Sequence, residues 1–68
     1  MYRKLMREIE DNGKTYRVYG EYDDDTPKYE YDWFQIYEVD INGQETQLTE
    51  EGDFDEMPSD QEILNFVR

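Results

Sequence analysis

Carboxylates are the side chains of this chain whose number and spacing could do chemistry. Residues 18–67 contain sixteen Asp and Glu residues against one base, Lys28. Carboxylates can serve as an acid–base pair, bind a hard cation through oxygen, or present negative charge to a basic partner. The rest of the sequence decides among these three uses.

Catalysis is the use that the composition favours least. The chain has no His and no Cys, so the common general base and the thiol nucleophile are both missing. Its one serine, Ser59, is explained as a helix cap. A glycosidase-type acid pair needs a cleft, and 68 residues leave little room for one. We therefore predict a protein without enzymatic activity and without catalytic residues.

Metal and cofactor sites are also not indicated. Asp23-Asp24-Asp25 and the acids of residues 53–56 could bind a hard cation, but neither segment follows the spacing of an EF-hand loop. Solvated acidic loops explain them more simply. Without Cys or His there is no zinc ligand set of the usual kind, and no Gly-rich phosphate loop is present. We expect no metal and no cofactor.

The distribution of charge is the strongest signal. The formal net charge is −12, yet residues 1–17 contain five bases and three acids, so the negative charge lies almost entirely after them. Such a surface repels phosphates, which disfavours nucleic-acid binding. Solubility needs a net charge of only about 2–8 in magnitude. We therefore predict a surface that enters a basic groove on another protein, formed by Asp23, Asp24, Asp25, Glu30, Asp32, Glu38, Asp40, Glu50, Glu51, Asp53, Asp55 and Glu56.

Residues 29–41 read as one long strand that would hold the centre of this surface. Its odd positions are mostly aromatic or aliphatic, and its even positions carry four of the acids. Since successive side chains of a strand point to opposite faces, the odd face is expected to anchor the core and the even face to bear the carboxylates. Phe34 and Ile36 lie among those acids, and the pattern leaves open whether they are buried or are apolar contacts.

Two hairpins are predicted from Asn-Gly pairs, the strongest short turn signal. Asn12-Gly13 makes residues 1–22 a hairpin, with Asp11 opposite Lys14 and, at its far end, Lys4 opposite Glu21. An amphipathic helix competes for the first arm, but its charges would oppose the helix dipole. Asn42-Gly43 closes the second hairpin, in which a type I′ turn would pair Val39 with Thr46 and Tyr37 with Leu48.

The last segment is predicted to be helical. Ser59 and Glu62 have the spacing of a capping box, and apolar residues follow. The expected fold is α+β: a four-stranded antiparallel meander of two hairpins with a short C-terminal helix on one face, in a single domain of residues 1–68. The expected core residues are Ile9, Val18, Trp33, Tyr37, Val39, Leu48, Ile63 and Val67. The N-terminus lacks the apolar stretch of a signal peptide and no segment is long enough to span a membrane, so we expect the cytoplasm of a host cell.

In size, in the lack of Cys and His, and in the acidic stretch of residues 19–62, the chain resembles the small acidic DNA mimics of phages and mobile elements, the anti-CRISPR and anti-restriction proteins. These proteins share charge rather than a motif. The resemblance implies inhibition through the DNA or PAM site of a CRISPR–Cas effector or a restriction enzyme, without direct nucleic-acid or membrane binding. Two alternatives stay open: an antitoxin-like module, and a structural or assembly module with an aromatic docking face around Tyr19, Phe34 and Ile36.

Overall fold

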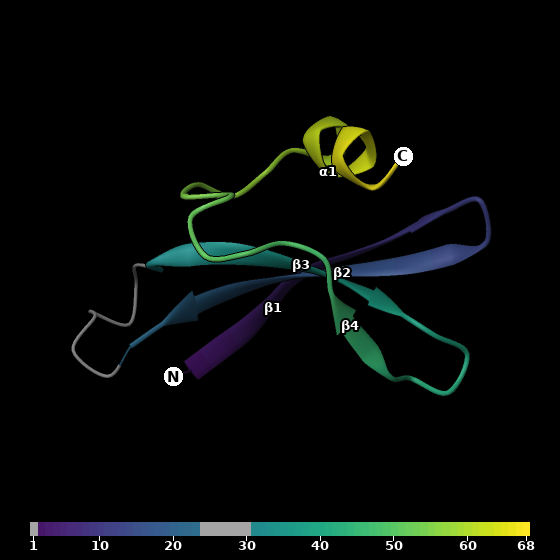
Figure 1. Cartoon of the computed structure of the whole chain (residues 1–68), viewed down its shortest axis with the longest axis horizontal. Helices are drawn as coiled ribbons and strands as arrows, with labels where there is room; N and C mark the ends of the chain where they lie inside the picture. The colour runs from purple at the N-terminus through teal and green to yellow at the C-terminus, as the bar shows by residue number, and fades with distance from the viewer. Residues whose placement is uncertain (1, 24–30) are drawn as a thin grey trace.

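The computed structural model describes residues 2–23 and 31–68. Four antiparallel strands form one open sheet in the order β1-β2-β3-β4, and one short helix follows them (Figure 1). None of the described residues belongs to a helix long and apolar enough to cross a membrane. The elements are β1 (Tyr2–Asp11), β2 (Lys14–Tyr22), β3 (Trp33–Val39), β4 (Glu45–Gln47) and α1 (Asp60–Val67).

The first hairpin confirms the strand prediction for residues 2–11 over the helical alternative. Asn12 and Gly13 both have positive φ, 53° and 79°, as a type I′ turn requires. Asp11 pairs with Lys14 as expected, but the register shifts between Leu5 and Arg7. This β-bulge places one extra residue in β1. The predicted pairing of Lys4 with Glu21 is therefore wrong, since Glu21 lies opposite Arg3 and Lys4 lies opposite Gly20.

The second hairpin has a different turn from the predicted one. Its loop has three residues, 41–43, and only Gly43 among them has positive φ, at 83°. The N–H of Gly43 donates to the Asp40 carbonyl at 2.9 Å, a type I turn followed by a left-handed glycine. The register is consequently one residue away from the predicted one. Val39 pairs with Glu45 and Tyr37 with Gln47, rather than with Thr46 and Leu48.

The hydrophobic core lies on the face of β3 opposite to the predicted one. Phe34 and Ile36, at even positions, are 7% and 0% exposed. The odd-numbered Trp33, Tyr37 and Val39 are only partly buried on the other face. The prediction that the odd face anchors the core is therefore wrong, and the open question about Phe34 and Ile36 is answered. The core cluster consists of Tyr16, Val18, Phe34, Ile36 and Ile63, with Ile9, Tyr31, Phe54, Met57 and Val67 packed against it.

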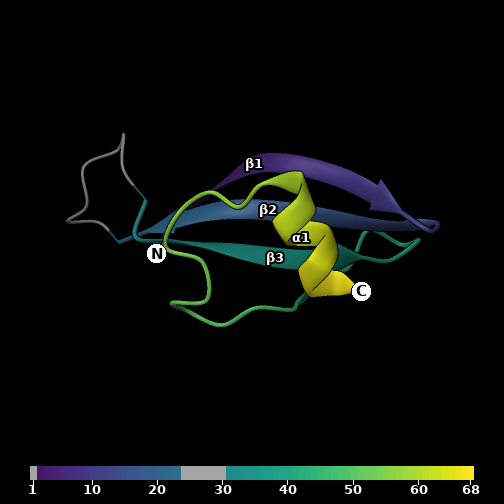
Figure 2. The ribbon, with the colours of Figure 1, turned by 90° about the horizontal axis from the view of Figure 1, so that it is seen from above.

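Helix α1 explains this choice of face. It lies on one side of the sheet and crosses over β2 and β3, as the two views of the ribbon show (Figures 1 and 2). Its one buried residue, Ile63, belongs to the core cluster. The predicted capping box is confirmed: the Ser59 hydroxyl accepts from the Glu62 N–H, and the Glu62 carboxylate accepts from the Ser59 N–H. Leu48, predicted to be core, is 36% exposed.

Candidate functional site

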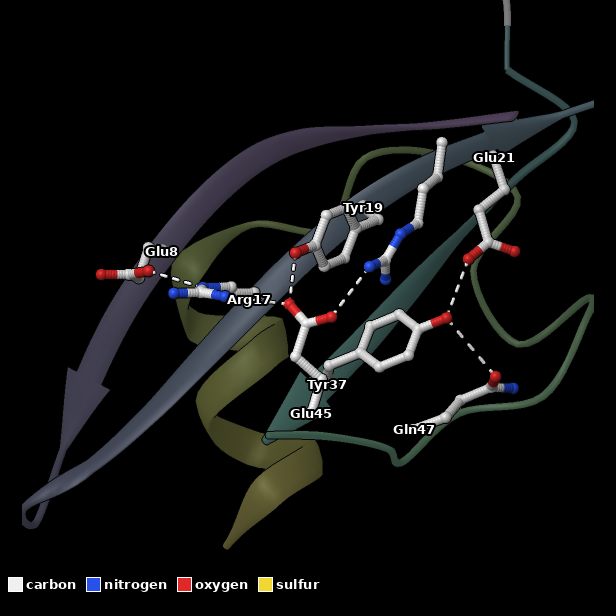
Figure 3. Close-up of polar contacts among 8 residues, drawn as sticks. Glu8, Arg17, Tyr19, Glu21, Tyr37, Glu45 and Gln47 are labelled. Carbon is white, nitrogen blue, oxygen red and sulfur yellow. Dashed lines mark hydrogen bonds and ion pairs between the residues drawn. The ribbon is translucent and has the colours of Figure 1, made fainter. Parts of the chain in front are cut away.

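The face of the sheet opposite α1 carries a polar network centred on Glu45. The Glu45 carboxylate accepts hydrogen bonds from the Tyr19 hydroxyl, from Arg3 at 2.9 Å and from Arg17 at 3.0 Å (Figure 3). The hydrogen bond from Tyr19, with those from the two arginines, lowers the pKa of Glu45 to about 2. This glutamate stays ionised across the physiological range and holds both arginines in place.

The two arginines make further contacts that compensate their positive charge. Arg17 donates to Glu8 at 2.7 Å, and this bond, with that to Glu45, raises its pKa. The Arg3 guanidinium lies 3.9 Å from the centre of the Tyr19 ring, a cation–π contact. Positive charge on this face is therefore neutralised by the chain itself.

A second carboxylate on the same face, Glu21, is only 5% exposed. It accepts from the Tyr37 hydroxyl at 3.0 Å (Figure 3). It also accepts from the Trp33 indole N–H at 2.9 Å. Burial, with the hydrogen bond to Glu21, raises the pKa of Tyr37. Beside these groups lies a cavity of about 380 Å³, lined by Tyr2, Arg3, Glu21, Gln35, Tyr37, Gln47 and Glu51.

Sequence reasoning missed this network. The alternating polar and aromatic residues Arg17, Tyr19 and Glu21 could have signalled a half-buried polar face on β2. Their partners on β3 and β4 depend on the register of the second hairpin, which was predicted one residue out. The predicted acidic surface did not include Glu21 or Glu45.

In the structure, the described carboxylates of the predicted row lie at opposite ends of β3 and do not form a continuous row. Asp32 precedes β3 and Asp40 follows it, which puts them roughly 26 Å apart at about 3.3 Å per residue. Between them Phe34 and Ile36 are buried, and Glu38 lies 3.9 Å from the ammonium of Lys14. The Asp40 side chain accepts from the N–H groups of one loop residue and of the first residue after the loop, so it stabilises the hairpin. Glu30, Asp24 and Asp25 lie outside the described residues.

The loop acids come together with Asp32 at one end of β3. The Phe34 N–H donates to the Phe54 carbonyl at 2.8 Å, which lays the segment around Phe54 along the start of β3. Asp23 reaches the same end, because its N–H donates to the Asp32 carboxylate at 3.1 Å. We call this group of exposed carboxylates the acidic end; it consists of Asp23, Asp32, Glu50, Glu51, Asp53, Asp55 and Glu56.

The described basic residues are mostly engaged elsewhere. Within residues 2–23 and 31–68, no Lys or Arg forms an ion pair with the acids of residues 50–56. Five of the bases in these ranges are paired with other acids. The pairs are Arg3–Glu45, Arg7–Asp60, Lys14–Glu38, Arg17 with Glu8 and Glu45, and Arg68–Asp11. The five acids of residues 50–56 in the acidic end are therefore left without a basic partner from the described chain.

The alternative aromatic docking face is not exposed. Tyr19, Phe34 and Ile36 are 8%, 7% and 0% accessible, so the patch predicted from them is buried within the protein. Residues 2–23 and 31–68 also contain no group of three or more carboxylates arranged to hold a metal ion.

Comparison with known proteins adds no family to this description. No protein-family model, no curated protein and no solved structure is significantly similar to the chain. Functional inference therefore rests on the residues of this chain and on their arrangement.

Proposed function

We propose that this protein is a non-enzymatic inhibitor that acts as a DNA mimic. It would occupy the positively charged nucleic-acid groove of a partner protein, either a CRISPR–Cas effector or a restriction enzyme. A groove built to bind phosphates with Lys and Arg attracts any surface that presents closely spaced negative charge. The partner would thereby be blocked from its DNA.

The acidic end is the observation that supports this proposal. Two segments about twenty residues apart in sequence meet at the start of β3, and each brings exposed carboxylates there. Charges of one sign repel, so bringing them together costs folding free energy. Binding to a basic partner would relieve this repulsion. The Phe34–Phe54 bridge holds the two segments in place. Binding would then need little rearrangement of this surface.

The site in this proposal is narrower than the row expected from sequence. Glu38 and Asp40 lie toward the opposite end of β3, where each has a structural contact with Lys14 or with the hairpin loop. We assign the partner-binding role to the acidic end and treat these two acids as structural. A test by reversing Glu38 and Asp40 would confound binding with folding.

The direct test measures DNA binding and cleavage by purified CRISPR–Cas effectors and restriction enzymes with and without the protein. We expect inhibition of at least one of them, competition by duplex DNA, and weaker inhibition as salt rises and screens the charges. The idea of mimicry fails if an inhibited partner binds its DNA as tightly as before.

A matched pair of double variants separates the acidic end from net charge. Asp55→Asn/Glu56→Gln removes two negative charges from it, whereas Gln61→Lys/Asn65→Lys adds two positive charges on the exposed side of α1. Both change the net charge from −12 to −10. Inhibition should fall in the first variant and persist in the second. An equal loss in both would mean that overall charge, rather than this surface, is responsible.

A further inference from the structure

The outer edge of β1 is an unpaired strand edge ten residues long. No other described segment forms a backbone–backbone hydrogen bond with it, and Figure 2 shows no element beyond it on that side. Six large hydrophobic side chains among residues 2–23 and 31–68 are exposed, and three of them lie on this strand: Tyr2, Leu5 and Met6, at 54%, 47% and 38%. Long apolar edges invite pairing with another strand.

The hairpin geometry shows which backbone groups point outward. The two-residue turn makes Asp11 and Lys14 a hydrogen-bonded pair, and hydrogen-bonded and open pairs then alternate. On β2 this alternation leaves Glu21 turned away from β1, in agreement with its carbonyl accepting from Asp32 on the β3 side. The β1 residues at open pairs, whose N–H and C=O face outward, are Arg3, Leu5, Glu8 and Glu10.

The bulge makes this spacing unusual. The outward residues are two, three and two positions apart, because the register shift lies between Leu5 and Arg7. In a partner strand without a bulge, the outward N–H and C=O groups recur every two positions. Such a strand could not stay in register with β1 on both sides of the bulge. A second β1 in antiparallel orientation has the same irregular spacing. It would place Arg3 opposite Glu10 and Leu5 opposite Glu8, with the two bulges facing each other across a two-fold axis.

The charged residues along β1 favour antiparallel pairing of two copies of this strand. The first half of β1 carries two bases, Arg3 and Lys4, and no acid, whereas the second half carries three acids and one base, Arg7. Antiparallel pairing of two copies sets the basic half of each against the acidic half of the other. Lys4 and Glu10 are exposed and form no ion pair within residues 2–23 and 31–68.

We propose that β1 is a self-association edge, through which two copies of this chain join their sheets into one eight-stranded antiparallel sheet. The dimer is isologous, as a two-fold axis requires. One strand pair is a small interface, so the dimer should be weak and concentration-dependent. Each copy keeps its acidic end, and the dimer presents two of them.

Analytical ultracentrifugation from micromolar to millimolar protein tests this directly. The mass should rise from 8.4 kDa toward twice that value with concentration. Leu5→Pro removes an outward N–H that the hairpin does not use, and it should shift the protein to monomer. Leu5→Val keeps the N–H and should still dimerise. Circular dichroism checks that both variants are folded.

A charge variant provides a second test that does not depend on proline. Glu10→Lys sets two positive charges opposite each other and should weaken dimerisation at least several-fold. Gln61→Lys/Asn65→Lys brings about the same change in net charge away from β1 and should not weaken it. A mass that stays at 8.4 kDa up to millimolar concentration overturns the proposal. So does a dimer that Leu5→Pro and Glu10→Lys leave intact.

Discussion

The hydroxyl of Tyr19 donates a hydrogen bond to the carboxylate of Glu45, 26 positions further along the chain. These residues belong to β2 and β4, which β3 separates in the sheet. Glu45 therefore ties the short edge strand to the centre of the sheet across its neighbour. This contact and the two arginine contacts make the open face a structural network.

Removing the charge of Glu45 should destabilise the protein. In Glu45→Gln the hydrogen bonds from Arg3 and Arg17 lose their charged acceptor, at a cost of about 1–2 kcal/mol once screening of the partly exposed arginines is included. Urea unfolding at neutral pH measures this loss. The exposed Glu50→Gln is the control and should change the free energy of unfolding by less than about 0.5 kcal/mol.

The stability of the protein should depend on pH through the ionisation of Glu45. The folded pKa of Glu45, about 2, lies below its ordinary value of 4.5. Its contribution is therefore fully present above about pH 5 and is lost as the pH falls from about 4.5 toward 2. The difference in unfolding free energy between wild type and Glu45→Gln should shrink over that window. A constant difference would show that the pKa is not depressed.

Gly20 should not tolerate a side chain. A Cβ at this position of β2 would lie 2.7 Å from Cδ1 of the Tyr31 ring. That ring packs against Tyr22 and Phe34, so it cannot move without losing contacts. Gly20→Ala should cost about 1–3 kcal/mol. In a Tyr31→Ala background the same change should cost much less, and a double-mutant cycle measures the coupling.

Asp40 should matter for the second hairpin rather than for binding. Its carboxylate accepts from the N–H groups of Asn42 and Gln44, both at 2.9 Å. Asp40→Ala should destabilise the fold by about 1–2 kcal/mol, whereas Asp40→Asn keeps the acceptor oxygen and should cost less. Thermal unfolding ranks the two. Equal effects would show that the negative charge, rather than the turn, is what Asp40 provides.

The burial of the even-numbered face of β3 can be tested by substitution of a core residue. Ile36 has no exposed surface and belongs to the cluster that α1 covers, so Ile36→Ala should cost about 2–5 kcal/mol. Ile41, in the hairpin loop, is 100% exposed, and Ile41→Ala should be neutral within about 0.5 kcal/mol. Similar losses at both positions would contradict the arrangement described here.

Local features of the fold followed from sequence because each depends on a few neighbouring residues. Asn12-Gly13 sets a two-residue turn, since both residues adopt positive φ at low cost. Ser59 and Glu62 cap α1 through contacts only three positions apart. The strands, the helix and the excess of negative charge could be read from the sequence in the same way.

Tertiary structure decided which face of β3 is buried and where the acids gather. Both faces of residues 33–39 offer apolar side chains, so alternation alone cannot choose between them. Docking of Ile63 chose the face with Phe34 and Ile36. The odd face then became the site of the Glu21 and Glu45 network. The Phe34–Phe54 bridge is a long-range contact, and it helps to bring the acids of residues 50–56 to Asp32. Sequence determined the amount of negative charge, and packing determined its place.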